Sequence, residues 1–91
     1  MSVHVGPYTF DHVSYDSDGD VLYLSIGVPR EAADSEETAE GHIVRYDDHE
    51  QVIGLTIVNA KWLLDRGETL SITFPQRPAI ADSSELQAAV A

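Results

Sequence analysis

Two stretches of the chain decide its fold, and they are similar to each other. Residues 15–26 read YDSDGDVLYLSI and residues 46–57 read YDDHEQVIGLTI. At an offset of 31 residues, five of the twelve positions are identical. In each stretch a tyrosine closes one strand, an aspartate opens a turn and an aliphatic stripe follows, which is the pattern of a β-hairpin. A chance match between two ordinary hairpins is the alternative, and either origin predicts a mostly antiparallel sheet.

Alternation within the two hairpins predicts which side chains form the core. Side chains on a strand point to opposite faces in turn, so every second residue shares a face. The predicted core face consists of Leu22, Leu24, Ile26 and Val28 in the first hairpin and of Ile53, Leu55 and Ile57 in the second. A single hairpin has no way to bury such a face alone. We therefore expect the two hairpins to lie side by side over one core.

The segments between and before the hairpins are more mixed. Tyr8 to Val13 has strand character. Pro29 to Gly41 is rich in acidic residues and predicts a long, mobile loop with a short edge strand near Thr38. A short helix is predicted over Ala60 to Asp65, with Asn59 as its N-cap and Gly67 as its stop.

The C-terminal third combines a strand with a helix. Thr69 to Phe74 alternates in hydropathy, and Pro75 and Pro78 are expected to end the sheet. Asp82 and Glu85 have the spacing of a capping box, which indicates a helix over Ser83 to Val90. Two helical turns are marginal alone, so this helix has to dock on the sheet or on a partner.

Together these segments predict one α+β unit. Its sheet is mostly antiparallel, has about four to six strands and is built from two similar hairpins, with a short helix near residues 60–66 and a C-terminal helix. Residues 1–7 are expected to form an N-terminal extension, 8–75 the domain and 76–91 a tail.

The charge balance narrows the classes of partner. Sixteen acidic residues against five basic ones give a net charge of −11. The bases are scattered, so the chain lacks the basic stripe that nucleic acids or anionic lipids require, and we expect neither partner. The acidic clusters indicate solvated loops, or else a partner with a basic surface or a cation site. Zero cysteines and an N-terminus without a signal-peptide pattern favour the cytoplasm.

The turn of the first hairpin is the one candidate metal site. Asp16, Asp18 and Asp20 alternate like the first ligands of a calcium loop. An EF-hand then needs glycine at its sixth position and glutamate at its twelfth, where this chain has Val21 and Gly27. A solvated turn and a weak divalent-cation site stay open. Structural turn roles are expected for Tyr15, Asp16, Asp20, Tyr46 and Asp47.

No catalytic residue and no cofactor is predicted from the chain. The four histidines lack metal-ligand spacing, and no serine lies in a Gly-x-Ser-x-Gly elbow. Trp62, Leu63 and Leu64 on the short helix indicate either core packing or an apolar patch that becomes buried in a dimer. Small chains bury a modest fraction of their surface, and we expect a homo-oligomer, most simply a dimer.

Three segments resemble a known family. They are YDxxxDVLYL at residues 15–24, IVxYD at 43–47 and VxGLxIxNA at 52–60. This combination resembles the YuzE-like family of small prokaryotic proteins, which is classed as a domain of unknown function. The resemblance implies a compact α+β unit with a curved antiparallel sheet and a short helix, and it implies no activity. Two parts depart from the family pattern, the acidic loop Pro29–Gly41 and the tail Gln76–Ala91.

Three functions follow from these patterns, in decreasing order of support. The first is a non-enzymatic module that dimerises and binds another protein through a sheet edge or its apolar helix. The second is a divalent-cation-binding protein that uses the acidic turn Asp16–Asp20. An enzyme is the third.

Overall fold

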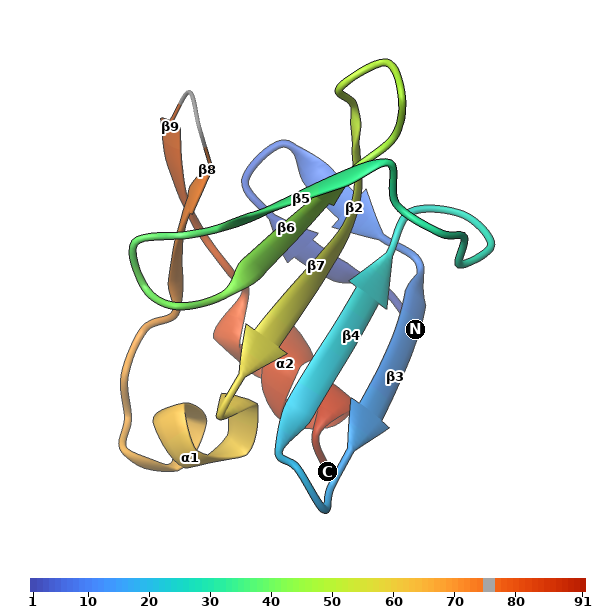
Figure 1. The fold of residues 1–91 in the computed structure, drawn as a ribbon. Helices are drawn as coiled ribbons and strands as arrows, with labels where there is room; N and C mark the ends of the chain where they lie inside the picture. Colours follow the sequence, from blue (N-terminus) through green and yellow to red (C-terminus); the bar gives the residue numbers. More distant parts are fainter. Residues whose placement is uncertain (75–76) are drawn as a thin grey trace.

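A five-stranded antiparallel sheet forms the centre of the protein. The computed structural model describes residues 1–74 and 77–91. The sheet has the order β3-β4-β7-β6-β5, so β3 and β5 are its edges (Figure 1). Its strands are β3 (His12–Asp16), β4 (Val21–Ser25), β5 (Asp34–Glu37), β6 (Ile43–Tyr46) and β7 (Val52–Val58).

Two short ribbons and two helices complete the fold. The ribbons pair β1 (Val3–Val5) with β2 (Tyr8–Phe10) and β8 (Ser71–Phe74) with β9 (Arg77–Ile80). The helices are α1 (Ala60–Asp65) and α2 (Ser83–Ala89). This architecture confirms the predicted α+β class. Within the described residues, no helix is both long and apolar enough to cross a membrane.

The core lies on one face of the central sheet, where the alternating residues of adjacent strands meet in register. Leu22 pairs with Ile57 and Leu24 pairs with Leu55 across β4 and β7, and all four side chains are fully buried. Figure 1 shows α2 behind these strands. Leu86 of α2 is also fully buried and belongs to the same hydrophobic cluster.

The predicted stripe of the first hairpin ends earlier than expected. Ile26 and Val28 lie beyond β4 and are 37% and 77% exposed. The strand stops because Gly27 has a φ of +74°, and its N–H donates to the Asp11 carboxylate at 2.7 Å. Left-handed backbone at Gly27 ends the alternation that put Val28 on the core face.

A sheet built only from two similar hairpins is too simple a description. β3 pairs with β4 and β6 pairs with β7, but β5 adds a further edge strand from within the predicted loop Pro29–Gly41. A β-bulge between Arg45 and Tyr46 also shifts the register of the second pair. The two remaining ribbons lie outside both hairpins.

Pro78 does not end the sheet, because it lies within β9 opposite Thr73. A proline is tolerated there since the ribbon has only two strands and one side of β9 needs no ladder donor. Pro75, the other predicted end, lies outside the described residues.

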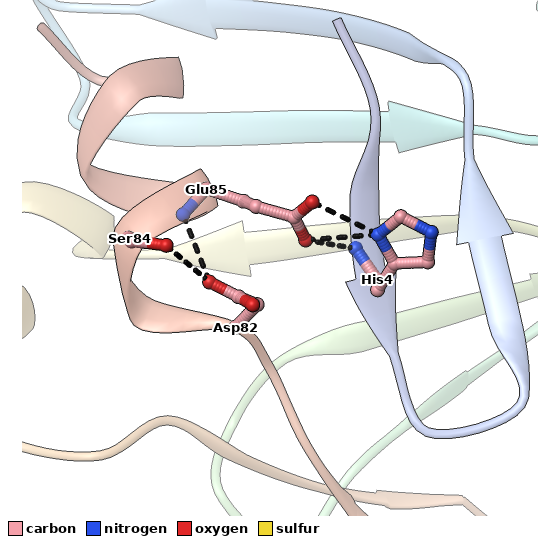
Figure 2. A network of polar contacts seen from close by, with 4 residues as sticks. All are labelled: His4, Asp82, Ser84 and Glu85. Atoms are coloured by element: carbon pink, nitrogen blue, oxygen red, sulfur yellow. Dashed lines mark hydrogen bonds and ion pairs between the residues drawn. The ribbon is translucent and has the colours of Figure 1, made fainter.

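The two chain ends are joined to each other (Figure 2). Asp82 caps α2 by accepting the Glu85 N–H at 3.1 Å, as the capping-box spacing predicts. The Glu85 carboxylate, however, turns to β1 and accepts the His4 backbone N–H at 2.8 Å and its ring Nδ1 at 2.9 Å. The Asp82 N–H in turn donates to the His4 carbonyl at 3.1 Å.

Residues from the predicted extension, domain and tail therefore share one core. Val3 and Val5 of β1 are fully buried, and Val90 beyond α2 is 6% exposed. Val5 also forms a β-bridge with Ala81. The division of the chain at residues 7 and 76 stays a prediction.

Candidate functional site

Asp20 ties the turn of the first hairpin to the start of α1. Its carboxylate accepts the backbone N–H groups of Lys61 at 2.8 Å and Trp62 at 3.0 Å. Its carbonyl accepts the Ala60 N–H at 3.2 Å. The first N–H groups of a helix have no partner within the helix, so Asp20 caps α1 from a distant part of the sequence. Asn59 was predicted as the cap, but its φ is 58° and its side chain makes no cap bond.

Tyr15 completes this junction. Its hydroxyl donates to Asp20 Oδ1 at 2.7 Å, and this bond is the main cause that raises the pKa of Tyr15 to about 12. Desolvation acts to raise the pKa of Asp20, but the bonds from Lys61, Tyr15 and Trp62 outweigh it and hold that pKa below its usual value. The junction therefore holds a charged carboxylate at the N-terminus of α1, where the helix dipole favours it.

Asp16 and Asp18 do not join Asp20 in a shared cluster. Asp16 Oδ1 accepts the N–H of Asp18 at 3.1 Å and that of Gly19 at 3.4 Å, which stabilises the turn locally. In the part of the chain that the structure describes, no group of three or more His, Cys, Asp or Glu residues could hold a metal ion. The carboxylates of Asp16 and Asp20 are thus bonded to backbone groups of different segments.

The second hairpin turn is held by Asp47. Its Oδ1 accepts the N–H groups of Gln51 and His49, both at 2.9 Å, and Oδ2 lies 3.3 Å from Nη2 of Arg30. The bond from the Gln51 N–H is the main cause that lowers the pKa of Asp47. Tyr46 plays a different part from its counterpart Tyr15, since its hydroxyl donates to Glu36 of β5 at 3.4 Å.

The apolar residues of α1 separate into core and surface. Leu64 is buried and Leu63 packs against the core, whereas Trp62 is 54% exposed. The guanidinium of Arg66 lies 4.4 Å from the centre of the indole ring, a cation–π contact. Of the three predicted interface residues, Trp62 is therefore the one with a large accessible surface. α1 ends with a Schellman motif, in which the N–H groups of Gly67 and Glu68 donate to Leu64 and Leu63.

The outer face of the central sheet was not singled out from the sequence. Among the described residues, neither helix lies over this face (Figure 1). Tyr23, Thr56 and Ile43 form a cross-strand row on it, with Tyr23 42% and Ile43 36% exposed. By alternation, the central strands β4, β7 and β6 present there Val21, Tyr23, Ser25, Gly54, Thr56, Val58, Ile43 and Arg45. None of these central positions is acidic, and the carboxylates of this face lie on the edge strands, where Asp16 is opposite Val21 and Glu37 is opposite Ile43.

Arg45 is the cation of this outer face. Its Nη2 donates to the Leu24 carbonyl at 2.9 Å, so the side chain crosses Gly54. A Cβ atom at residue 54 would clash with the guanidinium unless the Arg45 side chain moved, so the glycine leaves room for this side chain. Nε of Arg45 is buried and has no hydrogen-bond partner among the described residues. The sequence pattern predicts which strands pair but not their register, so it does not place Arg45 opposite Gly54.

A hollow of about 210 Å³ lies beside β5. Glu36 and Glu37 of β5 line one side of it, and Thr73 and Phe74 of β8 line another. Val44, Tyr46, Thr38 and Ala39 complete its walls. The hollow thus combines apolar and acidic groups at the edge of the sheet.

A family model for a protein of unknown function, DUF2283, matches residues 12–61. The chain belongs to the DUF2283 family. A search of curated proteins and a search of solved structures returned no match. The DUF2283 match runs from the first residue of β3 to the second residue of α1.

The DUF2283 region contains most of the features described above. It includes the whole five-stranded sheet, its outer face and both hairpin turns. It also includes Asp20 and the hydrogen bond that the Lys61 N–H donates to the Asp20 carboxylate. The β1–β2 ribbon, the β8–β9 ribbon and α2 lie outside the match. The hollow beside β5 is therefore formed partly by the DUF2283 region and partly by β8.

Proposed function

We propose that the protein is a non-enzymatic interaction module that forms a homodimer through the outer face of its central sheet. The observation that carries the proposal is the pair Tyr23 and Ile43, which are 42% and 36% exposed on either side of the buried Thr56, on central strands that present no carboxylate on this face. In a chain with a net charge of −11, most other surfaces would bring like charges together when two copies meet. The centre of this face carries no carboxylate, and Asp16 and Glu37 lie on its two edge strands. A contact over the central strands therefore limits that repulsion and buries aromatic and aliphatic area, the usual content of an interface centre. The cytoplasm is the compartment proposed with it.

Sedimentation of the chain over a concentration series tests the dimer. We expect a dimer at high micromolar concentration. Tyr23→Glu and Ile43→Glu should each weaken it by about tenfold or more, because a two-fold interface places every new carboxylate twice in a desolvated region. Val28→Glu is the matched control, since it adds the same charge at a loop residue that is 77% exposed and lies outside the sheet. Circular dichroism checks that each variant is folded.

Two results would overturn the outer face as the contact surface. One is a monomer at high micromolar concentration. The other is a dimer that survives both glutamate variants and is lost in Trp62→Ala, which would assign the contact to α1. The predicted interface residues Trp62, Leu63 and Leu64 would then be correct in place of the sheet face.

A divalent-cation role for Asp16, Asp18 and Asp20 receives less support. The Asp20 carboxylate already accepts three hydrogen bonds, and Asp16 Oδ1 accepts two. Calorimetry with calcium, magnesium and manganese should show no binding heat, and the melting temperature should not move. Saturable heat that disappears in Asp18→Asn would restore the cation function.

The YuzE-like label is narrower than the DUF2283 family, and it stays a proposal. It is supported by the segments at residues 15–24, 43–47 and 52–60, all of which lie within the matched region.

A further inference from the structure

Besides the outer face of the sheet, the edge of β5 is a candidate docking site. Among residues 1–74 and 77–91, β5 pairs with β6 alone, because it is the last strand of the sheet. Next to the β5–β6 pair, the Thr38 N–H donates to the His42 carbonyl, so the N–H of Thr38 points toward the β6 side. Backbone groups alternate in direction along an antiparallel strand, so the N–H and carbonyl of Glu37 point away from β6. Such a row of outward groups is a template for another strand.

Side chains on the inner side of β5 reach the adjacent hollow. Glu36 lies opposite Val44, whose buried side chain marks the inner face, and both line the hollow of about 210 Å³. Phe74 and Ala39 add apolar surface to its walls. A site with an apolar wall and a carboxylate at its rim suits a lysine or arginine side chain, which packs its methylene stem and keeps its charge near the surface.

The loop after β5 is anchored in a way that keeps this hollow in place. Both the backbone N–H and the hydroxyl of Thr73 donate to the Glu40 carboxylate, the former at 2.9 Å. Desolvation acts to raise the pKa of Glu40, but the bonds from Thr73 lower it overall. A charged Glu40 thus fastens the end of the β5 loop to β8, so one wall of the hollow is tied to the other.

The acidic side chains of β5 determine which kind of segment can bind at its edge. All four residues Asp34–Glu37 are exposed, and three of them are acidic. A second copy of the chain paired along this edge would set carboxylates against carboxylates, which destabilises a strand pair. A segment with lysines or arginines would instead meet opposite charges on an edge that already offers backbone groups.

We propose that the edge of β5 and the hollow beside it accept a basic, extended segment of a partner protein as a sixth strand of the sheet. The added strand places every second side chain over the hollow, toward Glu36. The intervening side chains lie on the outer side with Ser35 and Glu37. This inference rests on the proposed role as an interaction module, and it assigns the partner's chemistry to the β5 edge, which borders the outer face at Ile43.

A labelled peptide of alternating lysine and threonine, about six residues long as in a usual strand, tests the proposal by fluorescence anisotropy. We expect saturable binding to the full chain. The same peptide with N-methyl groups on alternate amides keeps its charge but loses the donors that pair with β5, so it should bind at least about tenfold more weakly. A peptide with glutamate in place of lysine should not bind.

Charge variants locate the site on the protein. The double variant Glu36→Gln/Glu37→Gln should weaken binding of the lysine peptide by about tenfold or more. Asp18→Asn/Asp65→Asn is the matched control, because it removes the same charge from two exposed positions, in the first hairpin turn and in α1, that belong neither to β5 nor to the lining of the hollow. All four positions are exposed or half-exposed, so each variant is expected to fold, and circular dichroism verifies this.

Three outcomes would overturn the proposal. They are no binding of the lysine peptide, equal binding of its N-methylated form, and equal weakening by both double variants, which would indicate only general attraction to an acidic surface. These outcomes differ from failure of the dimer, which is read by sedimentation. If the chain is a monomer that binds the peptide, only the proposal of a dimer through the outer face is wrong. If the chain is a dimer that does not bind the peptide, only the proposal for the β5 edge is wrong.

Discussion

At the scale of single residues, Asp20 has the largest structural role among the acidic residues of the hairpin turns. Its carboxylate satisfies two helix N–H groups and the Tyr15 hydroxyl together. Its φ is +54°, a conformation that aspartate and asparagine tolerate better than most residues. Asp20 therefore links the turn, the edge strand β3 and α1 through a single side chain.

Replacement of Asp20 by alanine should lower the free energy of unfolding by about 1–3 kcal/mol, because it removes a helix cap and leaves donors without a partner. Urea denaturation measures the loss. Asp18→Ala is the control, since that side chain is exposed in the same turn, and it should change stability by less than about 0.5 kcal/mol.

The pH dependence gives an independent check on Asp20. Its pKa is lowered in the folded protein, so the stability it contributes is complete above the unfolded pKa of about 3.9 and is lost as pH falls through the lower folded value. The difference between the wild-type chain and Asp20→Ala should therefore shrink below about pH 4. A difference that stays constant down to acid unfolding would contradict the role of the charged carboxylate.

At the scale of elements, the pairing of β4 with β7 forms the centre of the core. Leu24 and Leu55 occupy equivalent positions in the two similar stretches of sequence, and they lie directly opposite each other in the sheet. Both are fully buried. The contact between them joins the two antiparallel strand pairs.

Leu24→Ala and Leu55→Ala should each cost about 2–5 kcal/mol of unfolding free energy, the range for truncation of a buried leucine. Because the two side chains are neighbours, the double variant should not equal the sum of the single ones. Chemical denaturation of all three variants measures this. A loss below about half a kcal/mol at either site would contradict the face assignment.

The contact between α2 and β1 is the second element-scale feature that determines stability. Glu85→Ala should lower stability by about 0.5–1.5 kcal/mol, since the exposed His4 N–H loses its protein acceptor. The same change should speed hydrogen exchange at the His4 amide. Gln87→Ala, at an exposed position of the same helix, is the control and should leave that amide unchanged.

At the scale of the whole molecule, the chain closes on itself through its two ends. Val3 and Val5 from one end and Leu86 and Val90 from the other belong to one hydrophobic cluster. Both segments pack into this cluster, and α2 docks on the sheet as its short length requires.

Truncation after Ala81 should therefore destabilise the whole protein. It removes Leu86 and Val90 from the core, each worth about 1.5–3 kcal/mol when fully buried, so the loss should be at least about 3 kcal/mol. Thermal unfolding followed by circular dichroism measures it. A truncated chain that melts within a few degrees of the full chain would show that residues 82–91 form an independent tail.

The sequence by itself determined the local features of this protein. Period-two alternation placed Leu22, Leu24, Leu55 and Ile57 on the core face, since side-chain direction on a strand follows from position alone. Capping-box spacing likewise located α2, because an N-cap and its target are three residues apart in the chain.

Only the tertiary structure decided which distant segments meet. The cap of α1 comes from Asp20 instead of Asn59, the edge strand expected near Thr38 forms over Asp34–Glu37 and pairs with β6, and Glu85 binds His4 at the other end of the chain. The outer face and the hollow beside β5 arise in the same way. Each depends on contacts between residues far apart in sequence, and no local spacing encodes which donor will lie beside which acceptor once the sheet has assembled.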